Sequence, residues 1–156
     1  MLRYTTGNLL TANVEALVNT VNTEGVMGKG IALQFKKAFP DNFAAYQAAC
    51  QRREVAVGKM FVFETGRLDG LRWIINFPTK KHWRHPSTME YVRTGLADLV
   101  RVTKEIGIRS LALPALGCGN GGLAWASVRD AIESASSELP GVEILVFGLT
   151  PQTALT

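Results

Sequence analysis

The sequence of 156 residues has few cysteines, few charged residues and no long apolar run. Its two cysteines, Cys50 and Cys118, are too few for a disulfide framework, so we expect reduced thiols in a cytoplasmic protein. No segment approaches the roughly 18 apolar residues of a membrane helix, and residues 1–8 lack the apolar core of a signal peptide. These absences argue against a secreted protein and against a membrane partner.

The usual signatures of a metal centre and of a nucleoside-triphosphate loop are also missing. The two histidines and two cysteines show no metal-ligand spacing, so we expect no metal and no other cofactor. The Walker A pattern requires a glycine where Thr23 stands and a serine or threonine where Gly30 stands. Nor does the chain contain a serine nucleophile elbow.

What the sequence does have is the composition of a folded domain. An apolar fraction of 47% with a charged fraction of 19% argues against disorder. The length suits one hydrophobic core, so we predict a single, monomeric domain over residues 1–156. The net charge of +4 favours an anionic partner such as a nucleotide or nucleic acid. The polar residues 151–156 are interpreted as the edge of a longer natural chain.

One stretch organises the chain: an apolar strand over residues 16–21 runs into a glycine-rich loop and then a helix. Gly25, Gly28 and Gly30 permit tight turns and leave backbone amides uncovered, and the following helix directs its N-terminal amides toward an anion. A second loop, residues 116–122, repeats this chemistry in the second half of the chain. Two such loops predict a diphosphate site.

The second loop also matches the dinucleotide-binding fingerprint, with Gly117, Gly119 and Gly122 at the right spacing. In a nicotinamide-binding domain that fingerprint usually follows the first strand, and an acidic residue lies about 20 positions further on. Here the loop comes late in the chain, and Glu138 is only a loose fit for the acidic residue. A pyridine-nucleotide oxidoreductase therefore stays open as a less favoured alternative.

The remaining pattern predicts an α/β fold with strands and helices alternating in its second half. A glycine-containing turn between two strands predicts at least one antiparallel pair. Ser87 and Glu90 form a capping box, which opens a helix that ends at Gly107. Loops that leave strands and enter helices gather at one edge of such a sheet, where open α/β folds bind ligands. The predicted strands cover residues 2–5, 16–21, 59–64, 71–77, 110–113 and 142–147.

The loop before the capping box has no periodicity and is rich in cations and aromatics. Lys81, Trp83 and Arg84 fit a groove that follows a nucleic-acid backbone and stacks a base, whereas composition alone favours a solvated loop. Lys80 lies just past the carboxyl end of a buried strand, in line with both glycine loops. Desolvation and crowding by Lys81 and His82 are expected to lower its pKa and make it an amine nucleophile.

The run Val18-Asn19-Thr20-Val21-Asn22, followed by a glycine loop, resembles the Val-Asn-Ala-Ala-Asn signature of macrodomains, and Gly117-Cys118-Gly119 resembles their second phosphate loop. The likeness covers almost the whole chain. Residues 26–32 resemble the branch that contains the terminal ADP-ribose glycohydrolases. Residues 76–84, Asn-Phe-Pro-Thr-Lys-Lys-His-Trp-Arg, narrow the resemblance to the DarG antitoxin macrodomains.

This resemblance implies a three-layer α/β/α fold with a central mixed sheet and an ADP-ribose cleft at the strand ends. It also implies removal of ADP-ribose from thymidine in single-stranded DNA, which counters a partner DarT-like toxin and releases ADP-ribose. Lys80 matches the family's catalytic lysine, which is proposed to attack the anomeric carbon of the distal ribose and open the sugar as a Schiff base. Asn22 is expected at the distal ribose and Phe147 beside the adenine. Carried over by position, the ADP-ribose-binding residues are Asn8, Asn22, Met27, Gly28, Lys29, Gly30, Ile31, Ala32, Thr79, Leu116, Gly117, Cys118, Gly119, Asn120, Gly121 and Phe147.

Two positions depart from the family pattern. Asn8 stands where macrodomains commonly have the aspartate of a Gly-Asp-Ile turn, and Gly121 stands where the terminal glycohydrolases have a catalytic aspartate. His82 is the nearest titratable residue to replace that carboxylate as a proton shuttle. Loss of the side chain at position 121 is expected to widen the cleft for a thymine base. The alternatives are a reader that binds ADP-ribose without hydrolysing it and a hydrolase of ADP-ribosylated protein carboxylates.

Overall fold

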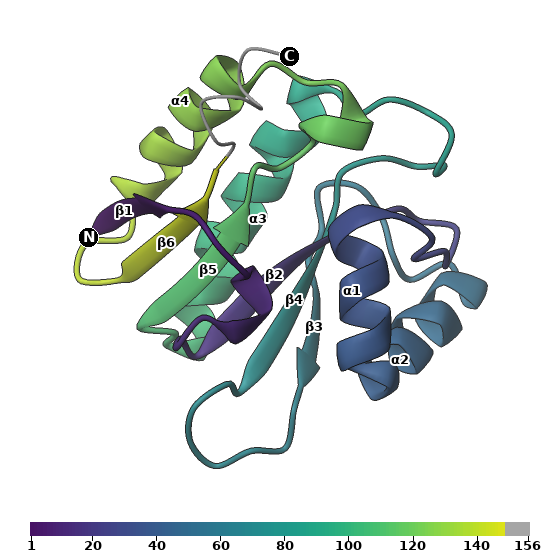
Figure 1. The fold of residues 1–156 in the computed structure, drawn as a ribbon, viewed down its shortest axis with the longest axis horizontal. Coiled ribbons are helices and arrows are strands. Elements are labelled where there is room, and N and C mark those ends of the chain that lie inside the picture. The colour runs from purple at the N-terminus through teal and green to yellow at the C-terminus, as the bar shows by residue number, and fades with distance from the viewer. Residues whose placement is uncertain (149–156) are drawn as a thin grey trace.

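A single six-stranded sheet forms the centre of the molecule, in the order β1-β6-β5-β2-β4-β3 (Figure 1). The computed structural model describes residues 1–148, so the predicted domain end at residue 156 and the segment 151–156 lie outside the described residues. β3 and β4 pair antiparallel, and the other neighbouring strands pair in parallel, which makes the sheet mixed. The strands are β1 (Leu2–Thr5), β2 (Ala16–Val21), β3 (Phe61–Glu64), β4 (Trp73–Pro78), β5 (Ser110–Pro114) and β6 (Glu143–Phe147).

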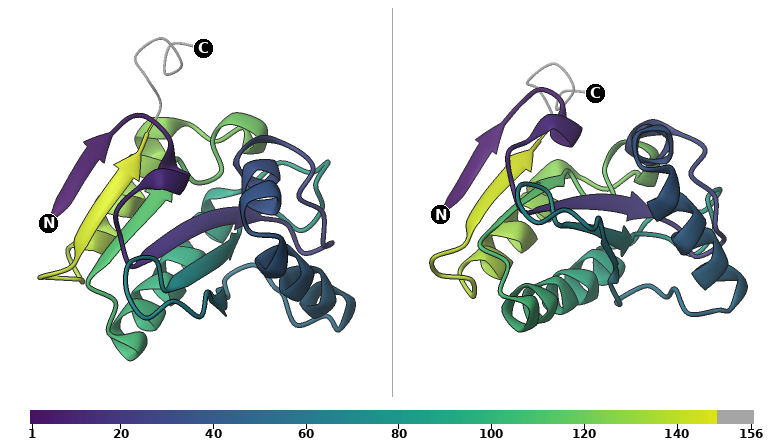
Figure 2. Two further views of the ribbon diagram at one scale, coloured as in Figure 1. Left: turned by 60° about the horizontal axis from the view of Figure 1, so that its bottom comes forward. Right: turned by 90° about the horizontal axis from the view of Figure 1, so that it is seen from below.

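Helices cover both faces of the sheet (Figures 1 and 2). α1 (Gly30–Ala38) and α2 (Pro40–Gln51) lie on one face, and α3 (Met89–Ile106) and α4 (Trp125–Ser136) lie on the other. Two short 3-10 turns, η1 (Leu9–Thr11) and η2 (Gly119–Gly121), complete the described elements. The three-layer α/β/α prediction is confirmed. Within residues 1–148, no helix is both long enough and apolar enough to cross a bilayer.

Each helical layer packs on its own hydrophobic cluster, because successive residues of a strand point to opposite faces. In β2, Val18 belongs to the cluster under α3 and α4, whereas Leu17 belongs to the cluster under α1 and α2. Both side chains are fully buried. Burial of one such side chain contributes about 1.5–3 kcal/mol, so this central strand is held from both sides at the point where the first glycine loop begins.

The structure confirms the predicted helix of residues 88–107 but moves its cap by one residue. Thr88, not Ser87, is the N-cap, and its side chain accepts a hydrogen bond from the Tyr91 amide. Ser87 is buried, and its amide donates to the carbonyl of Gly121 at 3.0 Å. Ser87 therefore faces the second glycine loop instead of the helix. The helix ends at Gly107, whose φ of +81° is the left-handed conformation of a helix C-cap.

The sheet topology brings three loops to one edge. β2, β4 and β5 are neighbouring parallel strands, so their carboxyl ends lie at the same edge of the sheet. The first glycine loop follows β2, the basic loop follows β4, and the second glycine loop follows β5. A backbone hydrogen bond from Thr79 to Val21 joins the first two of these loops at their start. The predicted meeting of the three loops is confirmed.

Candidate functional site

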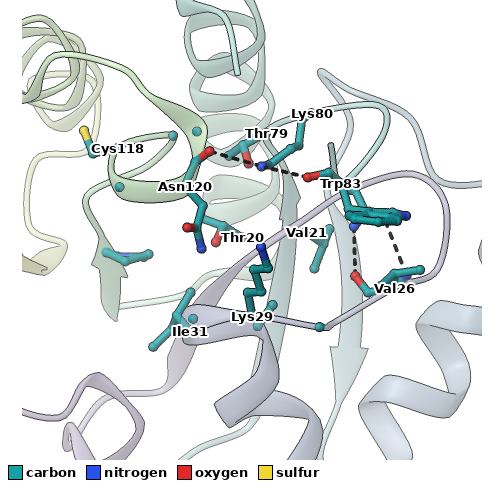
Figure 3. Close-up of a pocket in the computed structure, with 18 of the residues that line it drawn as sticks. Thr20, Val21, Val26, Lys29, Ile31, Thr79, Lys80, Trp83, Cys118 and Asn120 are labelled. Atoms are coloured by element: carbon teal, nitrogen blue, oxygen red, sulfur yellow. Dashed lines mark hydrogen bonds between the residues drawn. The ribbon is translucent and has the colours of Figure 1, made fainter. Parts of the chain in front are cut away.

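A cavity of about 790 Å³ lies at this edge, between the two glycine loops and the basic loop (Figure 3). Most of the residues predicted from the sequence line it. These are Asn22, Gly28, Lys29, Gly30, Ile31, Ala32, Thr79, Lys80, Trp83, Arg84, Gly117, Cys118, Gly119, Asn120 and Gly121. Five further residues that the sequence did not single out complete the lining: Thr20, Val21, Val26, Pro114 and Ala115. They are strand ends or lie between glycines, positions that carry no chemical signal of their own.

The first glycine loop is held by side-chain hydrogen bonds centred on Asn22. The side-chain nitrogen of Asn22 donates to the backbone carbonyl of Val26 at 2.8 Å. The side-chain oxygen of Asn22 accepts from the backbone amide of Glu24 at 2.9 Å. The hydroxyl of Tyr46, on α2, lies 2.8 Å from the Asn22 carbonyl and 2.9 Å from its side-chain oxygen. Burial raises the pKa of Tyr46, so the hydroxyl keeps its proton and donates it to Asn22.

The second glycine loop is held by its backbone and by close packing. The amide of Leu123 donates to the carbonyl of Gly117, and the amide of Gly121 donates to the carbonyl of Cys118. Gly117 has a φ of +72°, and a Cβ at this position would lie 2.6 Å from Leu123 Cδ1. Only glycine fits there without strain. Burial raises the pKa of the Cys118 thiol, which leaves it a poor nucleophile at neutral pH.

The two loops approach each other across the cavity. A Cβ added to Gly30, which has a φ of +56° at the start of α1, would lie 3.4 Å from the side-chain nitrogen of Asn120. The start of α1 therefore lies within van der Waals distance of the second loop, and both line the cavity. The N-terminus of a helix is a position that suits a bound anion.

Lys80 lies between these loops. Its ammonium is 3.4 Å from the carbonyl oxygens of both Trp83 and Asn120 (Figure 3). Partial burial lowers its pKa below the ordinary value, and the positive charge of Lys29 lowers it further. The predicted lowering is borne out in direction, but its second cause is a lysine of the first glycine loop and not the neighbours Lys81 and His82.

The basic loop is attached to the first glycine loop through Thr23. Both the amide and the hydroxyl of Thr23 donate to the carbonyl of Lys81, at 3.2 and 2.8 Å. Beyond this attachment, the ring of Trp83 is 40% exposed, and the guanidinium of Arg84 lies 4.5 Å from its centroid. These two hydrogen bonds connect the basic loop, which carries Lys80 and Trp83, to the first glycine loop.

Six predicted residues are not brought to the cavity wall. His82 packs its ring on Trp83, and its Nδ1 accepts from the amide of Arg84 at 3.0 Å. Lys81 is exposed outside the lining. Met27 and Leu116 are buried beneath the loops. The roles predicted for these residues stay predictions.

The last two of the six, Asn8 and Phe147, follow β1 and end β6, which are neighbouring strands. Asn8 caps the η1 turn, where its side chain accepts from the amide of Leu10 at 3.0 Å. Phe147 ends β6 and packs with the cluster under α1 and α2. The predicted adenine contact of Phe147 would therefore be on the α1 side of the sheet.

Ser87 occupies the space into which a side chain at position 121 would point. A Cβ at Gly121 would lie 2.5 Å from the hydroxyl of Ser87, and this buried hydroxyl has no hydrogen-bond partner among the described residues. A side chain at position 121 would therefore have to displace Ser87, and the expectation that Gly121 widens the cleft stays a prediction. Among residues 1–148, no cluster of three or more histidine, cysteine or acidic side chains is arranged to hold a metal ion.

The profile of the Macro domain family matches residues 18–132. A DNA ADP-ribosyl glycohydrolase of Thermus aquaticus is 61% identical over 94% of this chain, and the chain spans 41% of that protein's length. The macrodomain of Mycobacterium tuberculosis DarG superposes with a TM-score of 0.94 at 56% identity, covering 96% of this chain and 99% of that one. Thermosipho africanus DarTG, solved in complex with ADP-ribose, superposes with a TM-score of 0.89 at 31% identity, covering 99% of this chain and 46% of that one.

The profile match includes both glycine loops and the basic loop, which together surround the cavity. The structural match to the DarG macrodomain extends over nearly all of both chains. The chain belongs to the macrodomain family, and within that family it is similar to the macrodomains of the DarG proteins.

Proposed function

We propose that this chain is a DNA ADP-ribosyl glycohydrolase that removes ADP-ribose from thymidine in single-stranded DNA and so reverses the action of a DarT-like toxin. The observation that carries the proposal is the place of Lys80, a lysine with a lowered pKa held between two anion-binding loops. The name of the Thermus aquaticus relative supports the same reaction. Because the chain spans about two fifths of such relatives, the activity of a longer protein is part of the proposal.

In this proposal the two glycine loops hold the diphosphate of ADP-ribose. Gly28, Gly30 and the N-terminus of α1 line the cavity together with the second loop, so their backbone amides are proposed to donate hydrogen bonds to a diphosphate bound between the two loops. Asn22 lines the cavity and holds the first loop through its hydrogen bond to Val26, and we propose that it lies near the distal ribose. The binding loops thereby orient the anomeric carbon of that ribose toward Lys80.

The reaction begins when the Lys80 amine attacks the anomeric carbon. A bond forms between Nζ and this carbon, the bond to thymine N3 breaks, and the electron pair leaves with the base. The sugar ring opens to a Schiff base as the nitrogen passes a proton to the ring oxygen. Water then adds to the same carbon, and collapse of the adduct releases ADP-ribose and the Lys80 amine.

The attacking form of Lys80 is the amine, so the rate depends on its pKa. Partial burial and the charge of Lys29 lower that pKa, and lowering the pKa raises the amine fraction at every pH below the ordinary lysine value of about 10.4. The single-turnover rate should therefore rise with pH and reach half its maximum below that value. A rate that is flat between pH 6 and pH 9 would contradict an amine nucleophile.

The exposed side of the basic loop is proposed to receive the DNA strand. Trp83 presents a partly exposed ring at the cavity, with Arg84 beside it, and Lys81 points away from the cavity into solvent. Aromatic rings stack bases, and cations contact phosphates. Because phosphate contacts release counterions, oligonucleotide affinity should fall with salt more steeply than ADP-ribose affinity.

One observation favours a second candidate, a reader that binds ADP-ribose without cleaving it. No carboxylate lines the cavity among the described residues, and position 121 is a glycine. A site with cations alone binds a diphosphate well whether or not it performs hydrolysis. The experiment must therefore measure cleavage and binding separately.

Wild-type protein, Lys80→Ala and Lys104→Ala are incubated with a thymidine-ADP-ribosylated oligonucleotide and with a protein carrying ADP-ribosyl-glutamate. Lys104 is exposed in the last turn of α3, so its substitution is a matched loss of one charge. We expect release of ADP-ribose from the oligonucleotide, unchanged by Lys104→Ala and reduced about 1,000-fold or more by Lys80→Ala.

Each other outcome selects a rival. An oligonucleotide that stays modified while free ADP-ribose binds tightly supports the reader. Release from the glutamate-linked protein alone supports the hydrolase of protein carboxylates. Cleavage by Lys80→Ala at the wild-type rate contradicts the lysine mechanism with either substrate.

A further inference from the structure

The proposed reaction needs a proton donor that Lys80 does not supply. Thymine departs as an N3 anion, which is a strong base and a poor leaving group unless a proton reaches it. Lys80 must be an unprotonated amine to attack, so it has no proton to give at that moment. A second group must also remove a proton from the water that later resolves the adduct.

Few residues around the cavity are able to carry this proton. Among the described lining residues the titratable side chains are Lys29, Lys80, Arg84 and Cys118. A guanidinium does not lose its proton in proteins. The Cys118 sulfur is turned to the carbonyl of Leu116, at 3.8 Å. His82 does not line the cavity, and its Nδ1 is engaged by the amide of Arg84. Lys29 is the group that remains.

Lys29 has the geometry for this role. It precedes α1 in the first glycine loop, whereas Lys80 comes from the basic loop, and Figure 3 shows both side chains directed into the same cavity. Within residues 1–148, Lys29 forms no salt bridge and its side chain makes no cap hydrogen bond. Its charge is near enough to lower the pKa of Lys80. The ammonium is therefore free to serve a bound substrate.

We propose that the Lys29 ammonium is the general acid that protonates the departing thymine and that the resulting Lys29 amine is the general base that activates water. This inference rests on the proposed function. As Lys80 Nζ bonds to the anomeric carbon, the electron pair of the broken bond goes to N3, which takes a proton from Lys29. The Lys29 amine then takes a proton from water, hydroxide adds to the Schiff-base carbon, and Lys29 returns to its charged form.

The chemistry of the leaving group suits a lysine. The N3 nitrogen of thymine and the amine of lysine are bases of similar strength, so an ammonium is a matched acid for this base. A departing carboxylate, in contrast, is a weak base and needs no proton. An acid such as Lys29 therefore assists release from thymidine far more than release from glutamate. Its presence beside a carboxylate-free cavity makes the site selective for a basic leaving group.

The test changes the leaving group and the acid together. One oligonucleotide carries ADP-ribosylated thymidine and a second carries ADP-ribosylated 5-fluorodeoxyuridine, whose base departs more easily because fluorine stabilises the anion. Single-turnover rates of appearance of the unmodified oligonucleotide, which report the step that breaks the bond to the base, are measured for wild type, Lys29→Met, Lys29→Arg and Lys37→Met. Lys37 is exposed on α1 outside the cavity, so its substitution controls for the loss of one charge. Circular dichroism confirms that each variant is folded.

Lys29→Met should slow cleavage of the thymidine substrate about 100-fold, which is within the range of general acid catalysis. It should slow cleavage of the fluorinated substrate about 10-fold or less, because the better leaving group needs less protonation. Lys29→Arg should restore ADP-ribose affinity but not the rate, since arginine keeps the charge and gives up no proton. Lys37→Met should match wild type with both substrates.

Equal loss of rate on both substrates would overturn the inference and leave Lys29 as a phosphate-binding cation. Recovery of the wild-type rate in Lys29→Arg would overturn it as well, because charge alone would then be sufficient. A wild-type protein that cleaves neither oligonucleotide would overturn the proposed function and this inference with it.

Discussion

The two glycine loops face the same cavity but are stabilised by different forces. The first is held by side chains, with Asn22 bonding its own loop, Tyr46 bonding Asn22 and Thr23 bonding the basic loop. The second is held by backbone hydrogen bonds and by packing against Ser87 and Leu123. Polar side chains therefore set the shape of one loop, and the lack of side chains sets the shape of the other.

This difference predicts different weak points. A loop held by single hydrogen bonds loses stability in small steps, because each net hydrogen bond contributes about 0.5–1.5 kcal/mol. A loop whose glycines pack closely against neighbouring side chains loses more stability when a carbon is added, because overpacking and a strained φ act together.

Gly117→Ala should be the most damaging change. Its φ of +72° costs about 1–2 kcal/mol for a residue with a Cβ, and the added Cβ, 2.6 Å from Leu123 Cδ1 and 3.2 Å from Ser87 Cβ, forces both neighbours to shift. We expect urea denaturation to show a lower free energy of unfolding. Titration calorimetry should show an ADP-ribose Kd raised more than about 30-fold.

Gly66→Ala is the matched control for that change. Gly66 has a φ of +82° in the exposed β3–β4 turn, with nothing near its missing Cβ, so this variant measures strain alone. It should lose about 1–2 kcal/mol of stability and bind ADP-ribose normally. Equal losses of stability and affinity in the two variants would show that packing at Gly117 is unimportant.

Tyr46→Phe tests the first loop. The variant removes the hydroxyl that donates to Asn22 and leaves a buried acceptor without its partner, which costs about 1–3 kcal/mol. The ADP-ribose Kd should rise about 10-fold, because the loop loses order without losing its amides. Tyr91→Phe, on the part-exposed side of α3, is the control and should change neither quantity. An unaltered Kd in Tyr46→Phe would mean that Asn22 holds the loop alone.

Thr23→Val should have the smallest effect. It removes the hydroxyl bond to the Lys81 carbonyl, whereas the backbone bond between the same residues remains. We expect a single-turnover rate several-fold lower, since about 1 kcal/mol of positioning is lost. ADP-ribose affinity should be unchanged. Thr94→Val, which removes a hydroxyl bond on the surface of α3, is the control. A change in affinity without a change in rate would assign Thr23 to the glycine loop and not to Lys80.

The sequence predicted the elements with strong local signals. β1 and β2 were predicted to the residue. β2 is an apolar run before a glycine loop, and β1 is a short segment that ends just before the Gly7-Asn8 turn. The place of Lys80 followed from topology, since the residue after the carboxyl end of a central parallel strand lies at the ligand edge.

What the sequence could not predict are contacts between distant residues and the direction of side chains. Tyr46 and Asn22 are in contact although they are 24 residues apart in the sequence, and Ser87 and Gly121 are in contact although they are 34 residues apart. Neither contact produces a recognisable pattern in the local sequence. Lys81 and His82 are neighbours of Lys80 in sequence, but neither lines the cavity. The prediction from sequence proximity that they lower the pKa of Lys80 was therefore wrong about the source of the charge. Lys29, far away in sequence, supplies the charge because two loops fold over one cavity.

A reductive trap reveals whether Lys80 bonds to the substrate sugar. Wild-type protein is mixed with the thymidine-ADP-ribosylated oligonucleotide, quenched with borohydride at times spanning the first turnover and digested for mass spectrometry. The account predicts ADP-ribose attached through a reduced carbon–nitrogen bond on the peptide that contains Lys80, rising and falling as free ADP-ribose is released. An unmodified Lys80 peptide at every time point, while ADP-ribose is released at the full rate, would contradict it.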